Sequence, residues 1–317
     1  MRKQRRAPLF LIGLLGLLIL VVLLGTCGPV PTAAPGSGPG PTRIRAADSA
    51  EMVLVPGGEF SMGSADADPK AGADEKPQHT VYLDAFWINR TEVSNAQYAQ
   101  FLNALGANTD TCGGHDCVET KREDKHSHIL GAQDGSYVVE SGSEDHPVTQ
   151  VSWYGAQAYC AWAGARLPTE AEREKAARGT DGRSFPWGNE PPDCDKAQYG
   201  DCDGATEAVG SKPAGASPYG VLDMAGNEWE WVADWYDPAY YGSSPTQNPQ
   251  GPELGERKVP GRIVGVPTGV SAIRRPSPEP AHVCRLQCGV PLRGAAVALT
   301  PAAAAKEPAV DNVRPPS

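Results

Sequence analysis

The sequence predicts an α+β domain in which much of the chain is irregular. Three stretches have helical periodicity with good caps, and short strand-like runs separated by turn residues lie around them. Glycine and proline, 36 and 30 of 317 residues, exceed a fifth of the chain, while seven tryptophans supply large apolar anchors. This composition excludes a helical bundle and a disordered chain, and a chain of this length buries one large core or two small ones.

Residues 1–27 are predicted to be a membrane-targeting segment. Basic residues at the start precede a nearly unbroken apolar run over residues 7–24. Residues 24–27 (LGTC) are typical of a bacterial lipoprotein cleavage box, in which Cys27 becomes the lipidated first residue; the alternative is an uncleaved single-span anchor. In both cases the basic flank stays in the cytoplasm, so the domain is exported and tethered to the outer face of the cytoplasmic membrane.

Composition and charge divide the rest of the chain. Residues 28–46 are mostly Pro, Gly, Ala, Ser and Thr, and we expect them to form a linker. Residues 46–259 hold 15 basic against 35 acidic residues. This acidic balance repels nucleic acid, which excludes it as a partner, and it suits hard cations. We therefore place the folded domain at residues 47–259.

Three helices are predicted, at residues 94–105, 152–164 and 169–179. Each begins with a serine or threonine in the N-cap position, and a glycine ends each helical period. The third has a capping box, because Thr169 and Glu172 stand three residues apart after Pro168. Short strands are expected at residues 53–55 and 80–83.

Export permits disulfides, and two cysteine pairs are candidates. Cys112 and Cys117 flank two glycines in a short polar loop, which predicts a tight disulfide. Cys194 and Cys202 are the next candidate pair, with a zinc site as the competing interpretation. The disulfide is favoured because the chain has only six histidines and no second CxxC or HxxxH motif to complete four ligands.

Six ordered motifs carry a resemblance to a known family. They are residues 52–63 (MVLVPGGEFSMG), 91–95 (TEVSN), 151–153 (VSW), 166–172 (RLPTEAE), 186–189 (PWGN) and 223–231 (DMAGNEWEW). In this order they resemble the formylglycine-generating, sulfatase-modifying factor family, over roughly residues 50–259. The resemblance implies a C-type-lectin-like α+β fold with little regular structure, which agrees with the glycine and proline content.

The segment of residues 223–230 is the candidate metal site. Asp223 and Glu230 supply two carboxylates, and Gly226 between them lets backbone carbonyls turn inward, an arrangement that suits Ca²⁺. A surface carboxylate pair is the alternative. The family resemblance implies the ligand set Asp223, the carbonyls of Gly226 and Glu228, and the carboxylate of Glu230, with a structural role for the calcium.

Three residues depart from the family pattern. Arg173 stands where Trp is usual, Glu228 where Val or Ala is usual, and Gln198 where Asn is common. The change at Gln198 falls near the family's other calcium site, which we do not predict here.

No catalytic residue is assigned. The resemblance implies an oxygen-dependent oxidase that converts a sulfatase cysteine to formylglycine with a copper-holding cysteine pair, and soft thiolates suit Cu(I). The family's pair is C-x4-C near the C-terminus, after a Gly-Gly-Ser-aromatic motif. Cys112 and Cys117 have this spacing in the wrong place, and Cys284 and Cys288 have neither spacing nor motif. We therefore predict a catalytically silent, calcium-stabilised binding or accessory module for an unidentified protein, peptide or glycan, with the copper-dependent oxidase as the alternative.

Residues 260–317 differ from the rest in texture, with seven basic against three acidic residues and runs of Pro, Ala and Val. The family's Arg-Gly-Gly-Ser-Trp and Gly-Phe-Arg-Cys motifs are expected here and are missing. If residues 260–265 are written with the codons CCG GGG CGG ATC GTG G, reading from the second base gives CGG GGC GGA TCG TGG, which is the first motif. Residues 289–293, written as GGG GTT CCG CTG CGC, give the second motif in the same frame. We therefore predict an out-of-frame, poorly ordered tail.

Sequencing the gene around codon 260 tests the shifted frame. We expect one base more or fewer than in close relatives, with both motifs restored when the frame is repaired. An intact frame would refute the shift. The repaired protein is still expected to be silent, because the shifted codon that begins in Ser271 cannot encode the second cysteine.

Overall fold

A computed structural model describes residues 39–69, 71–106, 111–200, 202, 206–261 and 289–291. All of them belong to one compact unit of the chain. The targeting segment with Cys27 and most of residues 260–317 lie outside this part, so the expectations for them stay predictions. None of the helices in the described part has the length and apolar character needed to span a bilayer.

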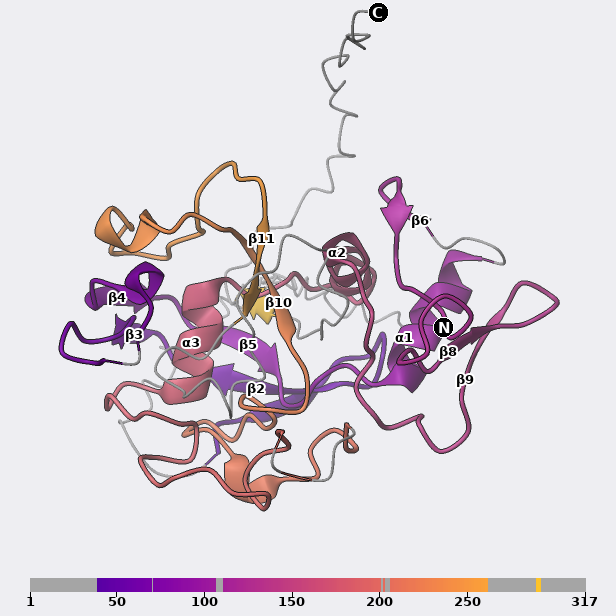
Figure 1. Ribbon diagram of the computed structural model, residues 1–317, viewed down its shortest axis with the longest axis horizontal. Coiled ribbons are helices and arrows are strands. Elements are labelled where there is room, and N and C mark those ends of the chain that lie inside the picture. The colour runs from indigo at the N-terminus through magenta and orange to yellow at the C-terminus, as the bar shows by residue number, and fades with distance from the viewer. Residues whose placement is uncertain are drawn as a thin grey trace, which may run out of the picture. The chain divides into compact units, whose positions relative to one another are not determined.

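The central sheet has four antiparallel strands in the order β1-β2-β5-β12 (Figure 1). Its strands are β1 (Thr42–Ile44), β2 (Glu51–Val55), β5 (Phe86–Asn89) and β12 (Gly289–Pro291). Val53 of β2 lies opposite Ile88 of β5, and both side chains are fully buried. Such cross-strand apolar pairs are the unit of sheet stability, so the β2–β5 pair anchors the sheet to the core.

The remaining strands form four two-stranded sheets. They are β3 (Gly58–Met62) with β4 (His79–Leu83), β6 (Thr111–Cys112) with β7 (His115–Asp116), β8 (Ile129–Gly131) with β9 (Tyr137–Val139), and β10 (Glu230–Trp235) with β11 (Lys258–Gly261). Both predicted strands are present, within β2 and β4. Long irregular segments join the elements, as the glycine and proline content predicts.

The three helices are α1 (Asn95–Leu105), α2 (Trp153–Trp162) and α3 (Glu170–Arg178). Three short 3-10 turns lie at Ala73–Glu75, Pro213–Gly215 and Tyr240–Gly242. The predicted N-caps Ser94, Ser152 and Thr169 each accept a hydrogen bond from a backbone N–H of the first turn. Capping satisfies N–H groups that the helix itself leaves without partners, which is why the sequence located these helix starts well.

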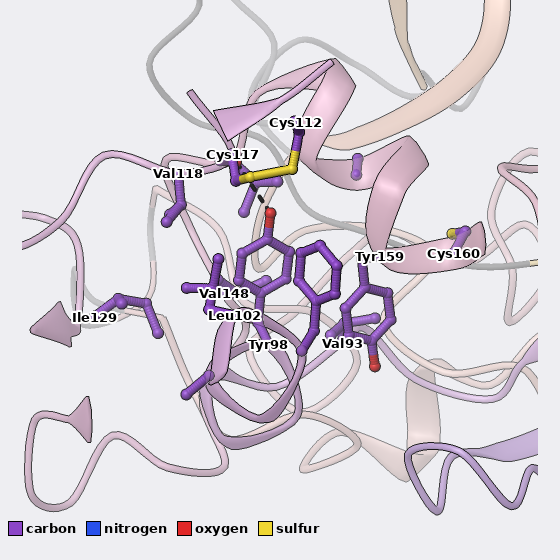
Figure 2. Close-up of a cluster of buried hydrophobic side chains, with 14 of the residues drawn as sticks. Val93, Tyr98, Leu102, Cys112, Cys117, Val118, Ile129, Val148, Tyr159 and Cys160 are labelled. Carbon is purple, nitrogen blue, oxygen red and sulfur yellow. Dashed lines mark hydrogen bonds between the residues drawn. A yellow bond between two sulfur atoms is a disulfide. The ribbon is translucent and has the colours of Figure 1, made fainter. Parts of the chain in front are cut away.

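The apolar side chains form two clusters. One lies between α3 and the strands β2, β3, β4 and β5, and the other lies around α1 and α2. Figure 2 shows Tyr98 and Tyr159 of the second cluster, whose rings stack at 5.5 Å. Phe101 meets both rings edge-on. Burying each such side chain stabilises the fold by about 1.5–3 kcal/mol.

The end of the expected linker is part of the folded domain. β1 pairs with β2, and Arg45 behind it is buried. The domain therefore begins before residue 47, where the sequence placed its boundary. The reason is that a three-residue strand after prolines and glycines has no detectable period, and tertiary contacts rather than local pattern hold it in place.

One strand of the sheet comes from the expected aberrant tail. β12 pairs with β5, and Gly289 also exchanges backbone hydrogen bonds with Arg166 at 2.7 and 3.0 Å. The tail is thus not without structure at residues 289–291.

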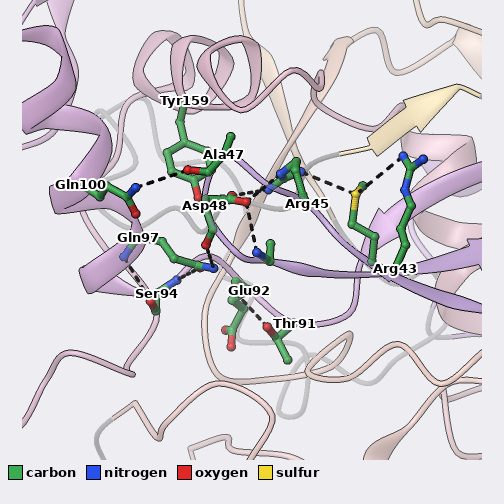
Figure 3. A network of polar contacts seen from close by, with 12 residues as sticks. Arg43, Arg45, Ala47, Asp48, Thr91, Glu92, Ser94, Gln97, Gln100 and Tyr159 are labelled. Carbon is green, nitrogen blue, oxygen red and sulfur yellow. Dashed lines mark hydrogen bonds and ion pairs between the residues drawn. The ribbon is translucent and has the colours of Figure 1, made fainter.

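A buried polar network fastens the start of the domain to α2 (Figure 3). Arg45 Nε donates to Asp48 Oδ1 at 2.9 Å, the Tyr159 hydroxyl donates to Asp48 Oδ2 at 2.6 Å, and the Ala50 N–H donates to Oδ1 at 3.1 Å. Burial by itself raises the pKa of Asp48, but the hydrogen bonds and charge of Arg45 and the Tyr159 hydroxyl outweigh it, so the pKa is below its usual value.

Replacing Asp48 tests this network. We expect Asp48→Asn to lower the free energy of unfolding by about 3 kcal/mol at neutral pH, because Arg45 stays buried without its counter-charge. A depressed folded-state pKa gives stability that is present above the unfolded-state pKa and is lost as the pH falls through the folded-state value. The difference between wild type and variant in urea denaturation should therefore shrink below about pH 4.

The matched control is Glu51→Gln, which breaks the Arg90–Glu51 pair at one end of the β2–β5 strand pair. Its partners are 41% and 34% exposed, so a loss below about 1 kcal/mol is expected. Equal losses in the two variants would show that burial of the Asp48 network contributes nothing.

Candidate functional site

Helix α3 is highly charged and yet buried. Residues 171–178 are all buried, although five of them carry charge. The helix contacts β3 and β4 on one side and β10 and β11 on the other (Figure 1). Because buried charges are costly unless they are paired, each of these side chains needs a partner inside the domain.

The partners of four of these charges are close. Glu172 forms a two-pronged pair with Arg166 at 2.6 and 2.7 Å. Arg178 donates to Glu174 at 2.6 Å, and Glu174 also accepts the Gly63 N–H at 3.0 Å. Lys175 Nζ donates to the Gly58 carbonyl at 2.7 Å. Burial lowers the pKa of Lys175 to about 8.

The fifth charge, Arg173, reaches the candidate metal site. Its Nε donates to Oε2 of Glu230, the first residue of β10, and its Nη2 donates to the Met224 carbonyl at 3.2 Å. The Arg173 side chain is 5% exposed and that of Glu230 is 0% exposed. The pair is therefore a desolvated ion pair at the end of the 223–230 segment.

The 223–230 segment is a tight loop. Three residues have left-handed backbone, with φ of 55° at Asp223, 86° at Gly226 and 61° at Asn227. A Cβ on Gly226 would lie 2.2 Å from the Gln198 carbonyl oxygen, so only glycine fits there. Asp223 Oδ2 accepts the Gly210 N–H at 2.6 Å. The structure thus gathers the predicted ligand residues in one loop, with Glu228 half-buried beside them.

The neighbouring loop is fixed by the second disulfide. Cys194 and Cys202 are joined with an S–S distance of 2.10 Å, so their sulfurs are not zinc ligands. Gln198, between them, accepts the Asn227 N–H through its carbonyl at 2.6 Å. Within the described ranges, no three side chains among His, Cys, Asp and Glu are grouped as metal ligands.

Two carboxylates with raised pKa values lie at the start of α3. Asp234 Oδ2 accepts the Glu170 N–H at 2.9 Å. Burial raises the pKa of Asp234 to about 7, and burial together with the Asp234 charge raises that of Glu170 to about 8. Near neutral pH these two groups therefore supply less negative charge than the sequence count suggests.

The motif tryptophans act as packing anchors. Lys258 Nζ lies 3.9 Å from the ring centre of the motif residue Trp153 and 3.7 Å from that of Trp235, which follows the last motif, and it donates to the Ala233 carbonyl at 2.9 Å. Burial lowers the pKa of Lys258 to about 8. The contact joins α2, β10 and β11, as expected for tryptophans that pack rather than bind.

The cysteine pair with C-x4-C spacing closes the β6–β7 hairpin. Cys112 and Cys117 form a disulfide with an S–S distance of 2.06 Å. Cys117 is fully buried, and its carbonyl accepts the Tyr98 hydroxyl at 3.0 Å (Figure 2). The Cys117 carbonyl also accepts the Ser152 N–H at 3.2 Å, which ties the hairpin to the start of α2. Cys160 of α2 is disulfide-bonded as well.

Comparison with known proteins identifies the family. The sulfatase-modifying factor enzyme 1-like domain matches residues 41–283, most of the chain. The chain belongs to the sulfatase-modifying factor family. The match begins within one residue of β1, in agreement with the folded start seen in the structure.

Relatives in the sulfatase-modifying factor family include whole enzymes and parts of larger proteins. The formylglycine-generating enzyme of Streptomyces coelicolor is 36% identical over 271 residues, covering 74% of this chain and 84% of that enzyme. The serine/threonine-protein kinase pkn1 of Chlamydia caviae is 37% identical over 212 residues, covering 66% of this chain and 32% of the kinase. The solved structure of PvdO from Pseudomonas aeruginosa has a TM-score of 0.59 at 26% identity, over 81% of this chain and 100% of that one.

The family binds calcium and copper. In this chain Asp223, Gly226, Glu228 and Glu230 stay a prediction as a calcium ligand set, and the sequence analysis missed the contact of Glu230 with Arg173. The signal was present, because Arg173 replaces the family's usual Trp. A substitution on a helix does not by itself reveal which strand the new charge meets.

Proposed function

We propose that this chain is an exported, membrane-tethered member of the sulfatase-modifying factor family that acts as a binding or accessory module without catalysis. The observation that carries the proposal is that the sequence has no C-x4-C pair after a Gly-Gly-Ser-aromatic motif near its C-terminus. An oxidase of this family needs such a thiol pair for Cu(I), and Cys112 and Cys117, which have the spacing elsewhere in the chain, are bonded to each other and packed on α2. The ligand is a protein, peptide or glycan.

Export is supported by the cysteines. The described residues hold two complete disulfides, Cys112–Cys117 and Cys194–Cys202. Disulfides persist in oxidising compartments and are rare in the cytosol. The basic and apolar segment before residue 27 supplies the route, through a lipidated Cys27 or an uncleaved anchor.

We leave calcium out of this function, because the carboxylate of Glu230 binds the Arg173 guanidinium. The calcium expected from the sequence required both Asp223 and Glu230 as ligands. In the structure the Glu230 carboxylate already pairs with the guanidinium of Arg173.

The alternative function is that of a formylglycine-generating oxidase, which uses oxygen and copper on a sulfatase cysteine. It is favoured by the 36% identity to the formylglycine-generating enzyme of Streptomyces coelicolor. It would require a pair of thiols among the cysteines outside the described residues, or reduction of the Cys112–Cys117 bond.

An activity assay separates the two functions. We expect the purified chain, supplied with copper and oxygen, to leave a cysteine peptide of sulfatase type unchanged, with no aldehyde detected by a hydrazine probe. The Streptomyces coelicolor enzyme is the positive control. Aldehyde formation by the chain would contradict the proposal, and its loss in the variant C112S/C117S would then assign the chemistry to this pair.

A further inference from the structure

We infer that the guanidinium of Arg173 takes the place of a metal cation at the 223–230 loop, so that this chain folds the loop without calcium. The inference concerns the family's usual calcium loop and does not depend on the proposed function. It rests on three observations. Arg173 contacts both Glu230 and Met224, the Arg173–Glu230 pair is buried, and a second cation at Glu230 would be repelled by the guanidinium.

Arg173 bridges the two ends of the loop. One nitrogen binds Glu230 at its end and another binds the Met224 carbonyl near its start. A calcium ion bound to Asp223 and Glu230 would make the same kind of link, from carboxylate and carbonyl oxygens of a single turn. A planar guanidinium with several fixed donors is suited to hold a carboxylate and a carbonyl together.

Charge and burial argue against a second cation. The Arg173 and Glu230 side chains are 5% and 0% exposed, so little water screens the charge between them. A divalent ion on the Glu230 carboxylate would lie next to the guanidinium and be repelled by it. Asp223 keeps its own contact, with the Gly210 N–H at 2.6 Å. In this loop the monovalent guanidinium of Arg173 therefore takes the place of a divalent Ca²⁺ ion at the Glu230 carboxylate.

Hydrogen bonds from the protein itself hold the rest of the loop. The side-chain amide of Asn227 donates to Glu92 at 2.8 Å, and its side-chain oxygen accepts the Glu207 N–H at 3.0 Å. The Asn227 N–H binds the Gln198 carbonyl, in a segment closed by the Cys194–Cys202 disulfide. Contacts with Glu92, Glu207 and Gln198 thus hold the left-handed backbone at Asn227, and Arg173 adds the contact with Glu230.

Thermal unfolding of the full chain with and without Ca²⁺ tests the inference. The wild type should melt at the same temperature in EGTA and in millimolar CaCl₂. The variant Arg173→Leu should melt lower than wild type in EGTA, because Glu230 loses its counter-charge. CaCl₂ should then raise its melting temperature by roughly 5 °C or more, because the ion regains the vacated carboxylate.

The matched control is Arg178→Leu, on the same helix. It breaks another buried pair, with Glu174, whose partners are 11% and 1% exposed. This variant should also be destabilised, but CaCl₂ should not restore it, because its pair lies away from the 223–230 loop. MgCl₂ in place of CaCl₂ controls for a general effect of divalent salt.

Two results would overturn the inference. One is a wild-type melting temperature that falls in EGTA, which would show that calcium binds beside Arg173. The other is an Arg173→Leu variant that calcium does not stabilise more than it stabilises Arg178→Leu. If Arg173→Leu does not fold, calorimetric titration of the wild type with CaCl₂ decides, since heat of binding to one site per chain contradicts the inference.

Discussion

The fold depends on a charged helix in its interior. α3 is enclosed by β3, β4, β10 and β11, and its charged residues reach partners on several other segments. Removing one partner from a buried ion pair typically costs about 3–5 kcal/mol, a large share of the stability of a whole domain. These ion pairs therefore help to position the strands and the irregular loops around α3. The 223–230 loop, which ends at Glu230, is one of these loops.

This constraint links the departures from the family to function. In our inference Arg173 gives the 223–230 loop an internal cation. Cys112 and Cys117, the pair with C-x4-C spacing, are bonded to each other. Neither change disturbs the fold, since the sheets, the three helices and the tryptophan anchors remain. The proposed binding function is compatible with this architecture, because function resides in sites that are added to a fold.

Local signals in the sequence predicted much of this structure. The N-caps at Ser94, Ser152 and Thr169 located all three helices, because capping is a contact within one turn. β1 was missed because a three-residue strand after prolines and glycines has no detectable period, and the Asp48–Tyr159 contact just beyond it joins residues 111 apart in sequence. The Arg173–Glu230 pair was missed for the same reason. The substitution was visible, but its partner follows only from how α3 packs against β10.

The most direct test of the central claim is the calcium content of the purified wild-type chain. The protein should be isolated without chelator, dialysed against CaCl₂ and then against metal-free buffer, and analysed for calcium per chain beside the Arg173→Leu variant. If the buried guanidinium serves as the cation of the Glu230 loop, the wild type retains no stoichiometric calcium and the variant retains more. One calcium ion per wild-type chain would contradict the account.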